Sequence, residues 1–266
     1  MTNRITFPIL GLEFNINRVA ISIFGFDIYW YALIITTGIL AGYFYALRQG
    51  KKQGIPGDVF SEILLIGIPS AIISARAYYV LSKWDYYSEN VTEIFNLRAG
   101  GIAIYGAIIG AVIAVLIYCK IKKINTLRIF DIGAVSLLIG QSIGRWGNFV
   151  NAEAYGYETD FIFKMGIYSD IAKEFIYYHP TFLYESLWNL LGAIILSVLN
   201  KKKKVDGLIF FLYIFWYGLG RFFIEGLRTD SLMAGNFRLS QIVAALSVII
   251  GVGVSVYLLT KGRSRD

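Results

Sequence analysis

The stretch Gly140-Gln-Ser-Ile-Gly-Arg-Trp-Gly-Asn-Phe-Val-Asn-Ala-Glu153 ends a long apolar run with an arginine, two asparagines and a glutamate. A charge inside a membrane is costly, and an ionisable residue there is functional by default. Arg145, Asn148 and Asn151 are three residues apart, so a helix would place them along one face. We expect this face to present hydrogen-bond donors to an anionic group. The alternative is that these polar groups satisfy one another in the core of a helix bundle.

The composition is that of an integral membrane protein. Of the 266 residues, 56% are hydrophobic and 16% are charged, whereas soluble proteins have roughly 45–50% and about 25%. The net charge of +7 is typical of cytoplasmic loops facing anionic lipids, and no motif for nucleic-acid binding accompanies it. A single cysteine and a single histidine exclude an internal disulfide and a multi-histidine or cysteine-rich metal site.

Seven stretches are long and apolar enough to cross a bilayer, which takes about 20 residues. The predicted fold class is therefore all-α: a polytopic membrane protein of about seven transmembrane helices. We expect one integral membrane domain over residues 1–266. The predicted spans are 22–48, 57–81, 100–119, 128–149, 181–200, 207–225 and 239–260.

The basic residues predict the orientation of these spans. Of the 25 lysines and arginines, 14 fall in one set of connecting segments and the C-terminal tail, and 8 in the other set. Because cytoplasmic loops carry the excess of basic residues, the N-terminus is expected outside and the C-terminus in the cytoplasm. The outer segment 152–180 is too long for a bare connector. We expect it to form a small extracytoplasmic head.

Several polar residues are expected at one depth. At about 1.5 Å of rise per residue, Arg76, Arg145 and Arg221 all reach the outer part of their spans. Further polar residues at a similar level near span ends are Tyr105, Glu153, His179 and Glu225. Polar groups from several spans thus converge in the outer leaflet. The lone His179 is a candidate acid or base, although such a histidine more often caps or packs.

A second polar ladder lies on the span 207–225. Tyr217, Arg221, Glu225 and Arg228 share a helix face through spacings of four, four and three. Two interpretations are open. Arg221 and Glu225 neutralise each other, or Arg221 stands beside Arg145 as a second cation for a lipid phosphate, whose oxygens suit a guanidinium fork.

Six segments, in this order, resemble motifs of the bacterial prolipoprotein diacylglyceryl transferases over nearly the whole chain. The chain differs from the family pattern at Ala32, where the pattern has glycine, and at Tyr105, where many members have histidine. The segments are Ile28-Tyr-Trp-Tyr-Ala32, Ser74-Ala-Arg76 with Tyr78 and Tyr79, Gly100-Gly-Ile-Ala-Ile-Tyr-Gly106, Gly144-Arg-Trp-Gly-Asn-Phe-Val-Asn-Ala-Glu153, His179-Pro-Thr-Phe-Leu-Tyr-Glu185 and Tyr217-Gly-Leu-Gly-Arg-Phe-Phe-Ile-Glu-Gly-Leu-Arg228.

The resemblance implies transfer of the sn-1,2-diacylglyceryl group from phosphatidylglycerol to the lipobox cysteine of a prolipoprotein, forming a thioether and releasing glycerol phosphate. This is the first step of bacterial lipoprotein maturation, and it needs no metal or organic cofactor. The implied place is the bacterial cytoplasmic membrane, with the site facing the outer leaflet. The implied catalytic residues are Arg145, Arg221 and Tyr105. The implied substrate-binding residues are Tyr31, Arg76, Asn148, Asn151, Glu153, His179, Tyr217 and Glu225.

The residues alone, without the resemblance, are also compatible with two other function classes. An anion transporter or channel could line its pathway with the same arginines. Its polar groups are then expected at both faces of the membrane, whereas here they gather at the outer one. An intramembrane protease is disfavoured, because no serine–histidine or aspartate pair lies at matched depth.

Overall fold

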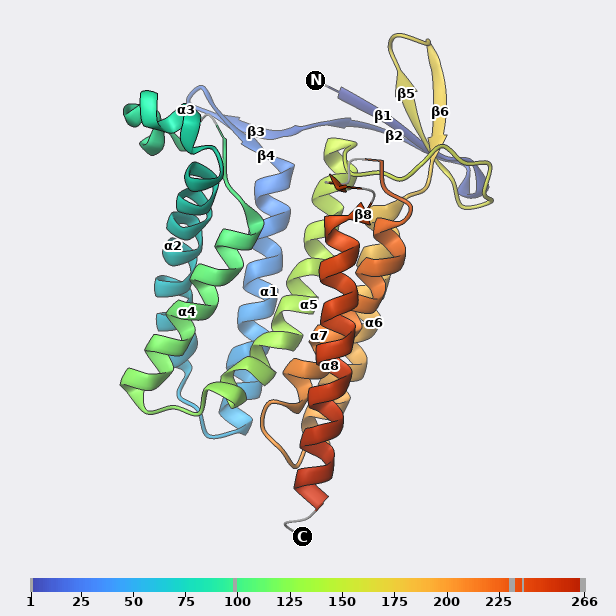
Figure 1. The fold of residues 1–266 in the computed structure, drawn as a ribbon. Coiled ribbons are helices and arrows are strands. Elements are labelled where there is room, and N and C mark those ends of the chain that lie inside the picture. Colours follow the sequence, from blue (N-terminus) through green and yellow to red (C-terminus); the bar gives the residue numbers. More distant parts are fainter. Residues whose placement is uncertain (1, 98–99, 230–232, 236, 264–266) are drawn as a thin grey trace. The chain divides into compact units, whose positions relative to one another are not determined.

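The computed structural model describes residues 2–97, 100–229, 233–235 and 237–263 (Figure 1). Within them, seven helices are long and apolar enough to cross a membrane, which confirms the predicted multi-pass, mostly helical fold. The intervening short helices are η1 (Pro8–Leu10), α3 (Trp84–Glu89) and η2 (Val91–Phe95). The long helices are α1 (Trp30–Lys52), α2 (Gly57–Ser82), α4 (Ile104–Lys122), α5 (Thr126–Asn151), α6 (Thr181–Lys202), α7 (Leu208–Glu225) and α8 (Leu239–Arg263).

The first predicted span began too early. Its residues 22–29 lie in a β-hairpin formed by β3 (Val19–Ile23) and β4 (Phe26–Tyr29), and α1 follows directly. The turn consists of Phe24 and Gly25, both with positive φ, as a two-residue hairpin turn requires. Because the hairpin is as apolar as the helix, hydropathy alone does not separate them.

An antiparallel sheet joins the N-terminus to the predicted head segment. Its strand order is β2-β1-β5-β6. The pairing of β1 with β5 through Ile5 and Ile167 brings residues 162 positions apart into one sheet. These strands were not predicted. Their bounds are Thr2–Phe7 for β1, Leu12–Asn17 for β2, Met165–Ser169 for β5 and Glu174–Tyr178 for β6. A separate pair, β7 (Met233–Ala234) and β8 (Phe237–Arg238), precedes α8.

The sheet packs on the ends of two helices. Ile5 and Met165 from the sheet are buried with Phe149 of α5 and Phe182 of α6. The rings of Phe149 and Phe182 stack with centroids 5.0 Å apart. This apolar contact holds the last turn of α5, which carries the predicted Asn148 and Asn151, beside the first turn of α6.

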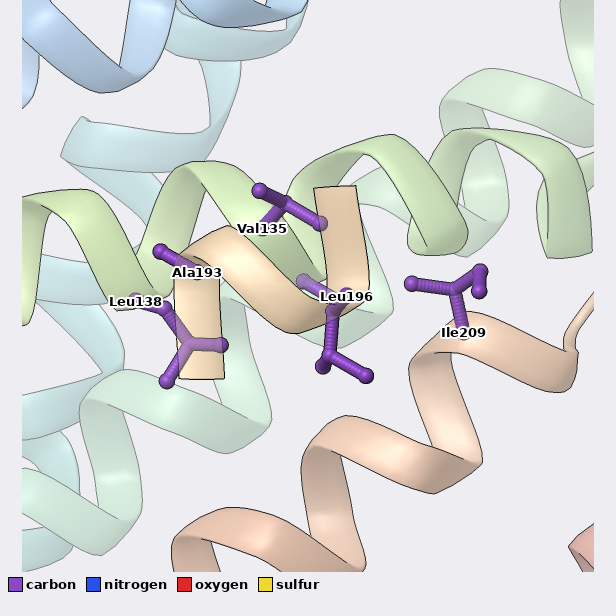
Figure 2. Packing of buried hydrophobic residues seen from close by; sticks show 6 residues of the cluster. Val135, Leu138, Ala193, Leu196 and Ile209 are labelled. Atoms are coloured by element: carbon purple, nitrogen blue, oxygen red, sulfur yellow. The ribbon is translucent and has the colours of Figure 1, made fainter. Parts of the chain in front are cut away.

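The chain forms two compact units: Met1–Ala46 with Phe130–Asp266, and Leu47–Ile129. In the first unit, α5, α6 and α7 share a buried apolar core. Figure 2 shows its side chains, which interdigitate between the three helices: Val135, Leu138, Ala193, Leu196 and Ile209. The predictions of a single membrane domain and of an extracytoplasmic head over 152–180 stay predictions.

Two close helix contacts fix the neighbours of α5 and α7. A Cβ atom on Gly42 of α1 would lie 2.8 Å from the carbonyl oxygen of Ser136 on α5. Trp188 of α6 and Trp216 of α7 stack with centroids 4.3 Å apart, and each indole N–H donates to the backbone carbonyl of the other residue. In the second unit, Gly106 and Gly110 lie against Ser74 in the same close manner, and glycines four residues apart are typical of close helix packing.

Candidate active site

A buried glutamate on α6 links arginines from two other parts of the chain. Glu185 is only 4% exposed. Nη2 of Arg145, on α5, lies 2.5 Å from Oε2 of Glu185, and Nη1 of Arg221, on α7, lies 2.7 Å from Oε1. Arg228, just after α7, approaches the same Oε1 to 3.8 Å. The Glu185 carboxylate therefore sets the distance between the two arginines predicted to be catalytic.

A second buried carboxylate balances part of the remaining charge. Glu225 forms an ion pair with Arg221 one turn earlier on α7. Three guanidinium groups and two carboxylates leave one excess positive charge in this cluster. The carboxylates are almost fully buried, whereas the arginine side chains keep 12–23% of their surface exposed. The accessible side of the cluster is therefore cationic, and an anion placed there would complete the charge balance.

The predicted polar face of α5 is continuous with this cluster. Arg145 donates from Nη1 to Oδ1 of Asn148 at 3.2 Å. The side-chain amides of Asn148 and Asn151 both donate to Oε1 of Glu153, at 3.0 and 3.3 Å. Arg18 donates to the backbone carbonyl of Asn151, which anchors the end of the helix. The structure thus brings all four predicted residues of this stretch together.

Tyr31 packs against the polar face of α5. A Cβ atom on Gly147 would lie 2.7 Å from Cδ2 of Tyr31, so the ring occupies the space that the glycine leaves open. Gly147 lies between Arg145 and Asn148 in sequence. Tyr31 is 40% exposed and is available both to shape the site and to contact a ligand.

His179 lies where the strand β6 leads into α6. Its backbone N–H donates to the carbonyl of Tyr157, and its own carbonyl accepts from the N–H of Gly156. Its Nδ1 lies 3.3 Å from the hydroxyl of Tyr184. Burial lowers the pKa of His179, so the ring is neutral at pH 7. These contacts suit the packing interpretation of this residue.

Tyr217 continues the site along α7, away from the sheet. Its ring stacks with Tyr213, with centroids 5.9 Å apart. The hydroxyl of Tyr213 accepts a hydrogen bond of 3.1 Å from Nε2 of Gln141 on α5. Helix α7 thus meets α6 through Arg221 of the predicted ladder and α5 through Tyr213, one turn before Tyr217.

Arg76, in the second unit, is buried on α2 and is bound to backbone oxygens. A guanidinium has five N–H donors, and those of Arg76 match five carbonyl acceptors. All five acceptors belong to the segment between α3 and α4. They are the carbonyls of Glu93, Ile94, Asn96, Gly100 and Gly101, at 2.5–3.3 Å.

Tyr105 begins α4 directly after this segment. Gly100 and Gly101 both have positive φ, and the N–H of Ala103 donates to the carbonyl of Ala75 on α2. Arg76 and Ala75 therefore hold the backbone that leads to Tyr105. Both predicted residues belong to the unit Leu47–Ile129, and the expected convergence with the arginine cluster stays a prediction.

Comparison with known proteins adds to this geometry. A family model described as prolipoprotein diacylglyceryl transferase matches residues 18–257. The chain belongs to this family. It is 46% identical over 250 residues to the phosphatidylglycerol–prolipoprotein diacylglyceryl transferase of Bacillus cereus (strain G9842), covering 92% of this chain and 93% of the relative. The relative of that name from Bacillus cereus (strain B4264) is 47% identical over 244 residues and 90% of both chains.

The family membership confirms the resemblance predicted from the six motifs and the identification as a transferase. All six motifs lie within the matched region. No group of three or more histidine, cysteine, aspartate or glutamate side chains suited to a metal occurs among the described residues.

Sequence reasoning missed Glu185 as a site residue. In the sequence, Glu185 ends the segment that begins at His179 and lies one turn below the membrane interface, without an assigned role. A carboxylate one turn inside an apolar span is as costly as an arginine there, and three arginines near one depth call for acidic partners. The depth of Glu185 in its span, together with the need to balance the arginine charges, therefore could have identified it as a site residue.

Proposed function

We propose that the chain transfers the diacylglyceryl group of phosphatidylglycerol to the cysteine thiol of a prolipoprotein lipobox. The observation that carries the proposal is the bridge Arg145–Glu185–Arg221, which presents two guanidinium groups from different helices at one place. Two planar guanidinium groups placed in this way suit a phosphate diester, whose oxygens accept charge-assisted hydrogen bonds. The family membership supports the same assignment.

The reaction places the developing charge beside these arginines. The cysteine sulfur attacks carbon 3 of the diacylated glycerol, a carbon–sulfur bond forms, and the bond from that carbon to the phosphate oxygen breaks. The electron pair of the broken bond stays on the leaving glycerol phosphate, and the thiol proton passes to that product or to solvent. Preorganised cations in a water-poor site stabilise such charge.

The roles of the other residues follow from their contacts. Glu185 aligns the guanidinium groups of Arg145 and Arg221 and keeps them from rotating away. The amides of Asn148 and Asn151, with Glu153, form a polar strip suited to the hydroxyl groups of the glycerol headgroup. Glu225 pairs with Nη2 of Arg221, Tyr217 stacks on Tyr213, and His179 contacts Tyr184 on α6.

Arg76 is assigned a different role from the one expected. Because its N–H donors match five backbone carbonyls, it is suited to hold the segment before α4 and not to bind phosphate. Tyr105, at the start of α4, is assigned the role of orienting the incoming thiol. In this arrangement the nucleophile belongs to the substrate, so the enzyme needs no catalytic cysteine.

The protein is assigned to the bacterial cytoplasmic membrane, with the arginine cluster in the outer leaflet and the β2-β1-β5-β6 sheet outside. The excess of basic residues in the opposite connecting segments supports this orientation. The partners are phosphatidylglycerol, surrounding membrane lipids, and a prolipoprotein whose signal peptide brings the lipobox cysteine to the outer surface.

A mass assay tests the proposal. The purified protein is incubated with phosphatidylglycerol and a lipobox peptide containing one cysteine. We expect the peptide to gain the mass of one diacylglyceryl group, with release of an equal amount of glycerol phosphate. A peptide with serine in place of the cysteine is the control. Binding of lipid and peptide without any mass gain would contradict the proposal.

A further inference from the structure

A second polar layer lies one helical turn from the arginine cluster, on the side away from the sheet. Gln141 precedes Arg145 by four residues on α5, Asn189 follows Glu185 by four on α6, and Tyr217 precedes Arg221 by four on α7. Residues four apart share a helix face, and four residues span about 6 Å along the axis. Three helices thus repeat their polar faces at a deeper level.

This layer contains polar atoms that lack a partner. Asn189 is 2% exposed, and its Nδ2 is buried without a hydrogen-bond acceptor among the described residues. The buried Oε1 of Gln141 likewise has no donor there, although its Nε2 donates to Tyr213. Buried polar groups in native proteins are nearly always paired, and an unpaired group beside a site calls for an explanation.

We propose that this layer binds the ester carbonyls of the diacylglyceryl group, an inference that rests on the proposed function. The two ester groups of phosphatidylglycerol lie on carbons 2 and 1 of the diacylated glycerol, one and two carbons from the reacting carbon 3, on its acyl-chain side. With the phosphate at Arg145 and Arg221, these esters fall at the level of Gln141 and Asn189, where the hydroxyl of Tyr213 is bound to Gln141.

The donors of the layer match the chemistry of an ester. An ester carbonyl accepts hydrogen bonds but cannot donate them. Nδ2 of Asn189 is an unused donor, and Tyr213 accepts from Gln141, which leaves its own hydroxyl proton to donate. Gln141 positions Tyr213 for this contact. The layer therefore distinguishes ester-linked from ether-linked glycerolipids, because the latter have no carbonyl.

The chain offers a matched control for Asn189. Asn200 lies eleven residues further along the same helix, is 4% exposed, and has both side-chain polar atoms buried without a hydrogen-bond partner in the described part of the chain. It lies near the opposite end of α6, remote from Glu185. An unpaired asparagine alone is therefore not a sign of the subsite. Eleven residues are about three turns, so Asn200 lies on nearly the same face of α6, and it is the level beside the arginine cluster that distinguishes Asn189.

The test compares two lipids of equal chain length, diacyl and dialkyl phosphatidylglycerol, with the purified full-length protein and the lipobox peptide. We expect the wild type to have a kcat/KM at least about tenfold higher for the diacyl lipid, because a site built to hydrogen-bond a group rejects the analogue lacking it. Asn189→Leu and Tyr213→Phe should each reduce this preference severalfold by raising KM for the diacyl lipid alone. Asn200→Leu should keep the full preference.

Two results would overturn the subsite. In one, the wild type transfers from both lipids with equal kcat/KM. In the other, Asn189→Leu and Tyr213→Phe lower both rates in parallel, as a purely structural defect would. A wild type that transfers from neither lipid would overturn the proposed function itself, and the inference with it, so the two failures are distinguishable.

Discussion

Nη2 of Arg145 lies 2.5 Å from Oε2 of Glu185, and this contact joins α5 to α6 at the centre of the polar cluster. The other oxygen of the same carboxylate is bound to Arg221. Neither arginine is positioned by its own helix alone. The separation of the two guanidinium groups, on which a phosphate clamp depends, is set by one buried acidic side chain.

Replacing Glu185 tests this relationship. Glu185→Gln keeps the shape of the side chain but removes the charge that aligns both arginines. We expect kcat for diacylglyceryl transfer to fall about 100-fold, a loss typical of a preorganised electrostatic site. KM for phosphatidylglycerol should not rise, because the cluster gains positive charge. Steady-state kinetics with varied lipid measure both constants.

The control is Glu62→Gln. Glu62 lies in the partly exposed first turns of α2, in the other unit, and forms an ion pair there with Lys122. It should leave both constants within about twofold, as exposed ion pairs contribute little. An unchanged kcat in Glu185→Gln would refute the aligning role.

The two arginines differ from lysines in geometry. Arg145→Lys and Arg221→Lys keep the charge but lose the planar fork. We expect each to reduce transfer about 100-fold, and the alanine variants to abolish it, without loss of the folded protein in size-exclusion chromatography. Arg4→Ala, which removes an exposed ion pair with Glu13 and the cation–π contacts of Arg4 in the sheet, should retain wild-type activity. Full activity of either alanine variant would exclude the phosphate clamp.

Gly147 is expected to affect activity because it determines the position of the Tyr31 ring. In Gly147→Ala the added Cβ would lie 2.7 Å from the ring, so Tyr31 must move. We expect roughly a tenfold loss of kcat/KM, since small displacements in a site are costly. Gly133→Ala on the same helix has open space around its Cβ position and should be neutral or slightly stabilising, because alanine favours helix. Equal behaviour of the two variants would contradict the prediction.

Arg76→Lys separates a positioning role from a substrate contact. A lysine cannot reach five carbonyls, so the backbone before α4 should loosen. We expect faster amide hydrogen exchange within residues 91–103, together with lower transfer activity. Loss of activity with unchanged hydrogen exchange would instead indicate that Arg76 binds substrate. Exchange in β5 serves as the internal control, because that strand belongs to the other unit.

The pH dependence of stability should reflect His179. Burial lowers the pKa of this residue in the folded state, so the unfolded chain takes up a proton at a higher pH than the folded one. The contribution to stability is complete above the unfolded pKa of about 6.5 and is lost as the pH falls below it. We expect the thermal midpoint in detergent to fall between pH 7.5 and 5.5, and to fall less in His179→Asn. An equal fall in both proteins would exclude His179 as the cause.

Much of the architecture was predictable because it depends on local patterns. Hydropathy over windows of about 20 residues located the seven membrane helices to within a few residues, apart from the start of the first. A spacing of three placed Arg145, Asn148 and Asn151 on one face, because helical periodicity needs no tertiary information. The order of the six motifs along the chain likewise indicates the family.

The remaining features depend on contacts between distant segments. The pairing of β1 with β5, the bridge from Glu185 to two other helices, and the five carbonyls around Arg76 join residues that no local period relates. The positions of apolar and charged residues, and their helical periodicity, can be read from the sequence. The pairing of the buried charges depends on the tertiary fold. An unpaired charge in a helix bundle is costly, and its partner is the opposite charge that packing places close to it.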